Sequence, residues 1–246
     1  MIVLKLGGSV VTDKERSETL DGEALDAAAD AVASALEAGV DDLVIVHGGG
    51  SFGHHNASEH GVTTTEGTHD AAAVLEIHGA MKTLNGFVLQ RLLERGVDAV
   101  PVHPFSTAYR DADGDLTVPT DQVATLLAEG FVPVLHGDVI AHSGRGATIV
   151  SGDELVAALA RDLEADRIGL CSTVPGVLDD GDDVIERISA YEDVAPVLGD
   201  SEATDVTGGM AAKVQALLEL ESEASIFGPE SLEAFLAGER PGTTVY

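Results

Sequence analysis

Short apolar runs rich in β-branched residues recur along the chain and alternate with segments of helical period. The runs are IVLKL at 2–6, LVIVH at 43–47, DAVPV at 98–102, FVPVLH at 131–136 and DRIGLC at 166–171. A run that is apolar throughout is typical of a strand buried on both faces. The alternation therefore predicts an α/β fold, with helices on both faces of a mostly parallel sheet and ligands at the carboxyl ends of its strands.

The segments between these runs are predicted to be helices or hairpins. Helical period covers residues 23–39, 66–95 and 153–166, the second as one helix or as two that break near Gly79 or Gly86. Residues 109–118 and 178–188 place Asp-Gly or Gly-Asp between apolar flanks, which predicts hairpins. Because no stretch resembles a repeat or a low-complexity linker, we expect a single domain over residues 1–246.

The surface of this fold is predicted to be strongly acidic. The 246 residues include 43 Asp and Glu against 13 Lys and Arg, a formal net charge of -30, yet 44% of the chain is hydrophobic. A chain with that much apolar content folds and carries its acid outside. The excess charge fits a salt-rich cytoplasm, where ions screen the repulsion, and it disfavours nucleic-acid binding because few cations can face phosphates.

Two further observations predict a cytoplasmic protein that does not enter a membrane. The single cysteine, Cys171, excludes an internal disulfide and falls in a strand-like run, where we expect it in the core. The amino-terminal stretch MIVLKLGGSVVTDK turns glycine-rich too early for a signal peptide, and no apolar run reaches membrane-spanning length.

Glycine-rich turns follow strand-like runs or precede helices. They read KLGGS at 5–9, HGGGSFG at 47–53, HGD at 136–138, SGD at 151–153 and TGGMAAK at 207–213. Glycine lets backbone N–H groups approach a ligand closely, and a helix that begins there favours anionic oxygens. One such turn means little, but this series favours a polyphosphate held by backbone, although the P-loop motif GxxxxGK[ST] is absent.

The chain holds only four lysines, and three of them lie in or beside these turns. A transferring phosphoryl group concentrates negative charge on its oxygens, so ammonium groups around it are what phosphoryl transfer needs. We interpret Lys5, at the end of a buried strand, and Lys213, one turn into a helix, as ligand contacts. Lys82 is expected to be solvated on a helix face, and Lys14 is ambiguous because TDK is ordinary turn composition.

Most carboxylates are expected to solvate the surface, but three stand out by position. Asp138 and Asp153 each follow a glycine, and Asp205 precedes the TGGM turn. Asp153 lies near the start of a predicted helix, so it could cap that helix or hold two lysines at a set spacing. The same two roles are open to Asp205, and the sequence does not separate them.

Histidines bracket the second glycine turn. His47 ends a strand-like run and is expected in the core, whereas His54 follows the glycines where a helix should begin. With His55 and His60 it could form a metal cluster, but the spacing lacks the geometry and the thiolates of a zinc motif, so we expect no metal site. An imidazole at the lip of an anion-binding loop suits a hydrogen bond to a second phosphate.

Taken together and in order, KLGGS, HGGGSFGH, PVLHGD, SGD and DVTGGMAAK resemble the motifs of the amino acid kinase family. The histidine of GSFGH resembles that of the isopentenyl phosphate kinase branch and its fosfomycin-kinase relatives. The resemblance implies an open αβα sandwich, usually a homodimer, with an acceptor lobe over roughly residues 1–150 and an ATP·Mg²⁺ lobe over 151–246. It also implies phosphoryl transfer from ATP to isopentenyl phosphate, giving isopentenyl diphosphate and ADP in archaeal isoprenoid synthesis.

The same resemblance implies a role for each motif residue. Lys5 and Lys14 would stabilise the transferring phosphoryl group, Lys213 would hold ATP phosphates, and Asp153 would organise the lysines. Further contacts to ATP would come from Gly7, Gly8, Ser9, Gly50 and Gly209. The acceptor would be bound by Gly49, Gly152 and His54, the last on its phosphate. In one departure, Thr173 of STVPGV stands where relatives carry an aspartate, at the expected contact to the nucleotide base.

Two other functions stay open at this point. Another kinase of the superfamily would act on UMP, on a carboxylate such as glutamate, or on fosfomycin; UMP and carboxylate kinases should not need His54. A nucleotide or metabolite sensor could keep the fold without turnover. Such a sensor would have no reason to retain Lys5, Lys14 and Lys213 together.

Overall fold

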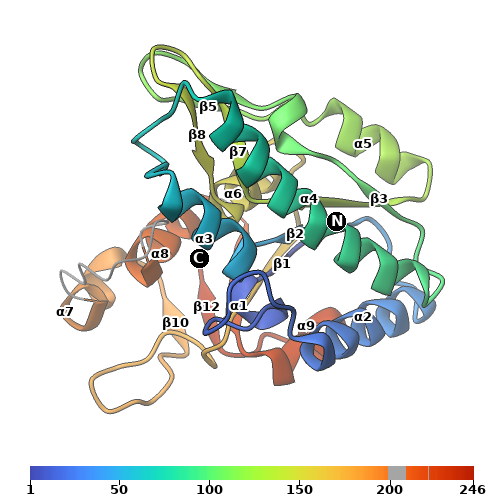
Figure 1. Ribbon diagram of the computed structural model, residues 1–246. Coiled ribbons are helices and arrows are strands. Elements are labelled where there is room, and N and C mark those ends of the chain that lie inside the picture. Colours follow the sequence, from blue (N-terminus) through green and yellow to red (C-terminus); the bar gives the residue numbers. More distant parts are fainter. Residues whose placement is uncertain (199–208, 221) are drawn as a thin grey trace.

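The computed structural model describes residues 1–198, 209–220 and 222–246. In this part of the chain the centre is an eight-stranded sheet in the order β10-β12-β11-β9-β1-β2-β6-β3. Figure 1 shows the helices that surround it. The strands are β1 Ile2–Leu6, β2 Leu43–His47, β3 Ala99–Pro101, β6 Val132–His136, β9 Arg167–Cys171, β10 Arg187–Ile188, β11 Glu223–Phe227 and β12 Thr243–Val245. All neighbours are parallel except β11 and β12, so the predicted α/β fold with a mostly parallel sheet is confirmed.

The five strand-like runs all form strands of this sheet, namely β1, β2, β3, β6 and β9. β1 and β2 have the predicted bounds, and β3, β6 and β9 differ from theirs by no more than one residue at either end. The sequence did not predict β11 and β12, because EASIF and TTV mix polar residues with apolar ones. The sheet runs through both halves of the chain, and its division into an acceptor lobe and an ATP lobe stays a prediction.

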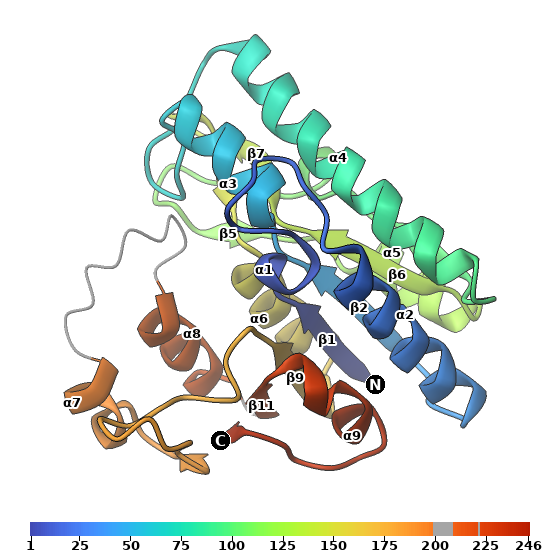
Figure 2. The same ribbon diagram turned by 60° about the horizontal axis from the view of Figure 1, so that its bottom comes forward.

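Helices cover both faces of the sheet (Figure 2). One face carries α1 Gly8–Val11, α2 Gly22–Glu37, α4 Ala71–Leu93 and α9 Leu232–Leu236; the other carries α5 Asp121–Ala128, α6 Gly152–Asp162 and α8 Gly209–Leu218. Alternation along β1 explains this division, because Leu4 and Leu6 pack with α2 and α9 whereas Val3 packs with α6. None of the helices in the described ranges combines the length and the hydrophobicity needed to cross a membrane.

The helix predicted over 66–95 is α4, and it is continuous. Of the two alternatives, the single helix is confirmed: α4 runs through Gly79 and Gly86 and is anchored along its length by buried side chains such as Ile77, Leu84 and Val88. Tertiary packing of this kind outweighs the helix-weakening effect of two glycines. The remaining short elements are α3 Gly50–Glu59, α7 Ala195–Leu198 and three 3₁₀ turns at Pro104–Ser106, Tyr191–Asp193 and Pro229–Ser231.

A second sheet of four strands lies beside the first, in the order β5-β4-β7-β8. It consists of β4 Tyr109–Arg110, β5 Leu116–Thr117, β7 Asp138–His142 and β8 Gly146–Val150. The predicted hairpin over 109–118 is confirmed as the antiparallel pair β4 and β5. The hairpin predicted over 178–188 is reduced to a single antiparallel bridge between Leu178 and Val184, because β10 pairs with β12 instead.

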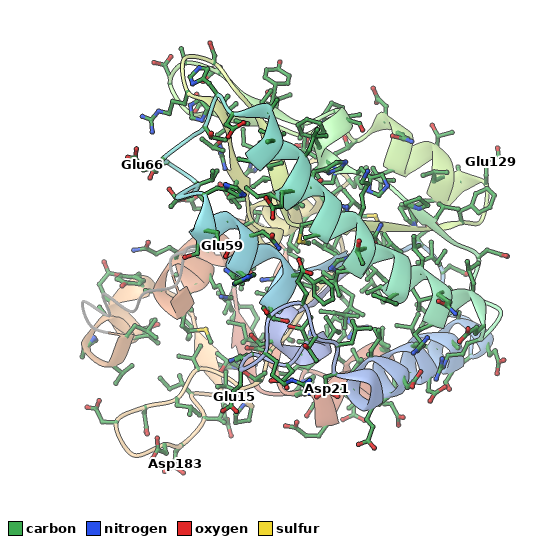
Figure 3. The ribbon with its side chains drawn as sticks, viewed as in Figure 1. Glu15, Asp21, Glu59, Glu66, Glu129 and Asp183 are labelled. Atoms are coloured by element: carbon green, nitrogen blue, oxygen red, sulfur yellow. The ribbon has the colours of Figure 1, made fainter. Side chains whose placement is uncertain are left out.

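The acidic side chains lie outside, as predicted. The labelled carboxylates of Figure 3, which include Glu15, Glu66 and Asp183, lie at the periphery of the molecule. Among the Asp and Glu residues that the structure describes, Asp138 alone is buried. Cys171 is in the core of β9, where burial raises the pKa of its thiol to about 12.

Candidate active site

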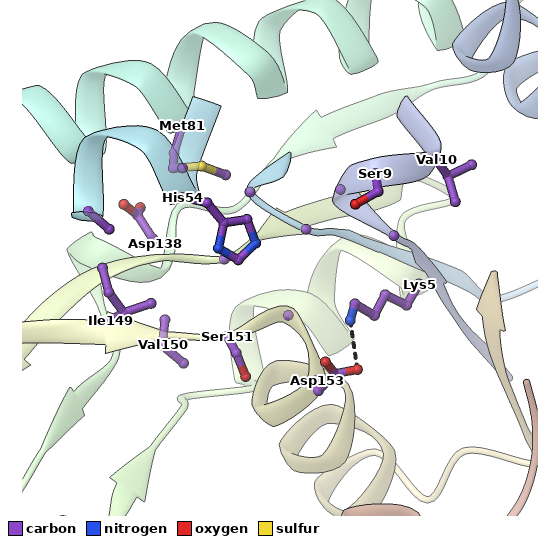
Figure 4. Close-up of a pocket in the computed structure, with 18 of the residues that line it drawn as sticks. Lys5, Ser9, Val10, His54, Met81, Asp138, Ile149, Val150, Ser151 and Asp153 are labelled. Atoms are coloured by element: carbon purple, nitrogen blue, oxygen red, sulfur yellow. Dashed lines mark hydrogen bonds and ion pairs between the residues drawn. The ribbon is translucent and has the colours of Figure 1, made fainter. Parts of the chain in front are cut away.

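The carboxyl ends of four neighbouring strands open into one cavity of about 200 Å³ (Figure 4). The residues that follow β9, β1, β2 and β6 all line it, including Ser172, Gly7, Gly48 and Gly137. The cavity therefore lies at the edge of the sheet where the strand pattern predicted a ligand.

The first two glycine turns touch each other through their backbones. A Cβ added at Gly8 would lie 2.1 Å from the Gly50 nitrogen, and one at Gly48 would lie 2.6 Å from the Gly8 nitrogen. Gly50 has a φ of +50° and faces Thr12 and the Gly8 carbonyl, so glycine is needed there for packing. Gly50 does not line the cavity, and neither does Gly209 at the start of α8, although Gly7, Gly8, Ser9, Gly49 and Gly152 do.

Asp153 brings two of the lysines together. Its Oδ1 lies 2.6 Å from Nζ of Lys5 on β1, and its Oδ2 lies 3.5 Å from Nζ of Lys213 on α8. Gly152 makes room for this pair, because a Cβ there would lie 3.1 Å from Cε of Lys5. Burial alone would raise the pKa of Asp153, but the two ammonium groups lower it overall, so the carboxylate stays charged.

The helix cap of α6 is made by other residues. The side chain of Ser151 accepts from the Glu154 N–H at 3.2 Å, and the Glu154 carboxylate accepts from the Ser151 N–H at 2.8 Å. This reciprocal capping box satisfies the amino end of α6 without Asp153. Of the two roles open to Asp153, the structure therefore leaves the pairing with lysines. Asp205 lies outside the described residues, as do Thr207 and Gly208 of the TGGM turn.

Lys14 reaches the same cavity from the loop after α1, on the side of Thr173. Its Nζ lies 3.5 Å from the Thr173 hydroxyl, a long contact, and both residues line the cavity. Thr173 offers Lys14 no counter-charge. Lys82 is exposed on α4, as predicted.

His54 projects into the cavity from α3 (Figure 4). Beyond it the lining becomes apolar, with Ala57 from α3, Ile77 and Met81 from α4, and Ile149 and Val150 from β8. The sequence did not identify these side chains, because β8 was not predicted and apolar residues on α4 could equally have been core. A Cβ added at Gly53 would lie 2.8 Å from Sδ of Met81, so this glycine lets the thioether approach α3.

The neighbouring histidines do not join His54. His55 lies 3.7 Å from Glu59 along the same helix, and His60 lies 2.8 Å from Glu76 on α4. No group of three or more potential metal-ligating His, Cys, Asp or Glu side chains is found in the described ranges. The rings of His55 and His60 therefore contact glutamates at the surface of the protein.

A buried polar cluster lies behind the apolar end of the cavity. Asp138 is among the residues that line the cavity, and its buried carboxylate lies 2.9 Å from Nδ1 of His78, to which it is hydrogen-bonded. Burial raises the pKa of Asp138, although His78 opposes the shift. His47, predicted to be a core residue, is fully buried and stacks on His136, which in turn contacts His103.

Comparison with known proteins identifies relatives that match over the full length of the chain. The model of the amino acid kinase family matches residues 1–226. An isopentenyl phosphate kinase of Haloferax volcanii is 62% identical over 245 residues, which cover 100% of this chain and 98% of the relative. An isopentenyl phosphate kinase of Methanocaldococcus jannaschii is 30% identical over 260 residues, which also cover 100% of this chain and 98% of the relative. An X-ray structure of isopentenyl phosphate kinase superposes with a TM-score of 0.86 at 28% identity, covering 100% of this chain and 99% of the other.

Proposed function

The chain belongs to the amino acid kinase family, and from that premise we propose that it transfers the γ-phosphoryl group of ATP to isopentenyl phosphate, giving isopentenyl diphosphate and ADP. The observation that carries this proposal is the order in which charged, polar and apolar residues line one cavity. Lysines and glycine turns lie at one end, His54 follows, and an apolar pocket lies at the other end. This arrangement suits a phosphate with a short apolar chain.

At the charged end, the proposed role of the lysines is to neutralise the transferring group. Asp153 fixes the ammonium groups of Lys5 and Lys213 before a nucleotide enters, so little reorganisation is needed during transfer. Lys14 approaches from a separate loop. The acceptor is itself a phosphate whose oxygens are already ionised, so no strong general base is required, and positioning with charge neutralisation carries the reaction.

At the acceptor end, His54 donates to the acceptor phosphate, and the N–H groups of Gly49 and Gly152 complete its binding. The isopentenyl chain then lies against Ile77, Met81 and Ile149. This assignment explains why an imidazole stands between glycine turns and an apolar pocket. A UMP or carboxylate acceptor would have no use for such a pocket.

Magnesium fits this site as a companion of ATP. Mg²⁺ keeps several waters and commonly binds through substrate phosphates with one or two carboxylates. The described residues offer no cluster of ligating side chains, and the Asp153 carboxylate is already engaged by two lysines. The ion would be held by the nucleotide phosphates and would add positive charge there. We also propose that the protein is a cytoplasmic homodimer with an acceptor lobe over roughly residues 1–150 and an ATP lobe over 151–246, both of which contribute residues to the cavity.

An acceptor panel tests the proposal. ADP release is measured by a coupled assay with ATP, Mg²⁺ and each of isopentenyl phosphate, dimethylallyl phosphate, UMP, glutamate and fosfomycin. We expect isopentenyl phosphate to give the highest kcat/KM. A higher value with UMP, glutamate or fosfomycin would reject the proposed acceptor, and the absence of ADP release with all five would favour a sensor.

A further inference from the structure

Two buried histidines occupy equivalent places behind the cavity. His47 ends β2 and His136 ends β6; they are partners in the parallel ladder, and their ring centroids are 5.5 Å apart. Each is followed by a glycine that lines the cavity, Gly48 or Gly137. Nδ1 of His47 lies 3.0 Å from the Gly48 carbonyl oxygen, and Nδ1 of His136 lies 2.9 Å from that of Gly137. The mechanism above uses neither ring.

The hydrogen bonds fix the protons on both rings. A carbonyl oxygen can only accept, so Nδ1 carries a proton in each ring. Burial lowers the pKa of His47 and lowers that of His136 still further, so both rings are neutral and accept at Nε2. For His136 the donor is Nδ1 of His103, 2.9 Å away. For His47 the donor is the side-chain amide of Asn85. The amide oxygen is placed 3.2 Å from Nε2 of His47, and the amide nitrogen is buried without a hydrogen-bond partner among the described residues. Exchanging the positions of the amide oxygen and nitrogen lets the nitrogen donate to Nε2 of His47.

The hydrogen bond from His47 determines which way the next peptide faces. The described chain contains no cis peptide bond, so the Gly48 carbonyl and the Gly49 N–H point in opposite directions. The carbonyl faces the fully buried His47 ring, and the N–H therefore faces away from it, on the side where Gly49 lines the cavity. No backbone carbonyl of the described residues accepts from this N–H.

The backbone turns sharply after this peptide. Gly49 has φ of -72° and ψ of -29°, and Gly50 has φ of +50°. A right-handed residue followed by a left-handed one can gather successive N–H groups into an anion-binding nest. Here the Ser51 N–H donates to Oγ1 of Thr12 and Gly50 does not line the cavity, which leaves the Gly49 N–H to face a ligand. A reversed Gly48–Gly49 peptide would instead direct a carbonyl oxygen at the ligand, which would repel it.

We propose that His47 is a positioning residue for phosphoryl transfer: its Nδ1–H holds the Gly48 carbonyl away from the cavity and so presents the Gly49 N–H to the phosphate oxygens. The stacked ring of His136 and the Asn85 amide keep the His47 ring in the required plane. The inference rests on the proposed function, because phosphates are the ligands that this N–H would contact.

A matched pair of substitutions separates this role from packing. In His47→Asn the amide nitrogen takes the place of Nδ1 and can still donate to the Gly48 carbonyl. In His47→Gln the longer amide reaches the place of Nε2, near Asn85, and leaves the carbonyl without a donor. Both remove a buried ring, so unfolding by urea should show similar losses of stability. The measurements are kcat, KM for ATP and for the acceptor, and calorimetric binding of isopentenyl phosphate.

We expect His47→Gln to lose about 10²-fold in kcat, the usual cost of one backbone or side-chain donor to a developing charge, while His47→Asn stays within about tenfold of the unsubstituted protein. Equal kcat in the two variants, or a loss in both that follows stability, would overturn the proposal. If the unsubstituted protein phosphorylates another acceptor, the proposed substrate is rejected but the role of His47 is not. The kcat values of His47→Gln and His47→Asn are then compared with that acceptor. If the unsubstituted protein transfers no phosphoryl group, weaker binding in His47→Gln than in His47→Asn still supports the positioning role, and equal binding rejects it.

Discussion

Nζ of Lys5 lies 2.6 Å from Oδ1 of Asp153, an ion pair that joins the central strand β1 to the amino end of α6. Lys5 is only 7% exposed, and Asp153 is also the partner of Lys213. Two ammonium groups meet at one carboxylate, so each lysine depends on Asp153 for its place. The chemistry proposed for the cavity depends on this arrangement.

Replacing Asp153 by Asn should lower kcat by about 10²-fold or more, because Lys5 and Lys213 would repel each other and leave their positions. The amide keeps the size of the side chain, so the loss reports the charge. Steady-state assays of Asp153→Asn are to be compared with Asp162→Asn, an exposed carboxylate at the other end of α6. Equal activity of the two variants would contradict the role given to Asp153.

The same substitution should change the response to acid. The pKa of Asp153 lies below its usual 3.8 in the folded protein, so its ion pairs stabilise the fold above that pH, and this stability is lost as the pH falls through the lowered pKa. Asp153→Asn should therefore be less stable than the unsubstituted protein near neutral pH, by about 3 kcal/mol. Urea unfolding from about pH 6 to about pH 3 should show this difference shrinking. A difference that grows toward low pH would refute the assignment.

Replacing His54 by Ala should abolish transfer to isopentenyl phosphate and leave ATP binding nearly unchanged, because the ring lies beside the apolar part of the cavity, where we propose that the acceptor binds. ADP release gives the activity, and calorimetry gives ATP binding. The matched control is His55→Ala, which removes the next ring of α3, an exposed one whose contact is Glu59. Unchanged activity in His54→Ala would remove the basis of the substrate assignment.

Met81 should limit the length of the acceptor chain. Its side chain is 1% exposed and lines the apolar end of the cavity, so Met81→Ala would open space there at a cost of about 3 kcal/mol in stability. We expect kcat/KM for geranyl phosphate, relative to isopentenyl phosphate, to rise at least about tenfold. Leu75→Ala, on the exposed side of the same helix, serves as the control and should leave this ratio unchanged. No change in the ratio for Met81→Ala would place the chain elsewhere.

Salt should stabilise the protein. The formal charge of -30 is carried mostly by exposed carboxylates, whose repulsion is screened by ions. Raising KCl from dilute buffer to about molar concentration, where screening acts over about 3 Å, should therefore raise the melting temperature and the activity. Full helicity and stability by circular dichroism in dilute buffer would contradict this expectation.

Strands β1, β2, β3, β6 and β9 of the central sheet could be predicted from the sequence because their runs are mostly apolar. IVLKL and LVIVH can only be buried on both faces, and glycine turns directly after them mark the ligand edge. Strands β7, β8, β11 and β12 carry more polar residues, and their pairing depends on distant partners. That pairing could not be predicted from a local pattern.

The site was predictable where function demands an unusual residue and not where it uses ordinary ones. Lys5, Lys14 and Lys213 stood out because lysine is rare in this chain, and the cavity contains all three. Gly50, which stays a predicted contact to ATP, does not line the cavity and packs against Thr12; glycine serves close backbone contact as well as ligand binding. Met81 and Ile149 resemble any core residue in the sequence, and only the structure shows that they line the cavity.

The identity of the product tests the proposed reaction most directly. Phosphorus NMR of the protein with ATP, Mg²⁺ and isopentenyl phosphate follows every phosphate in one sample. The proposed function predicts that the monoester signal disappears while two coupled signals of a diphosphate ester grow in equal amount with ADP. Release of ADP together with inorganic phosphate while the monoester signal persists would contradict it.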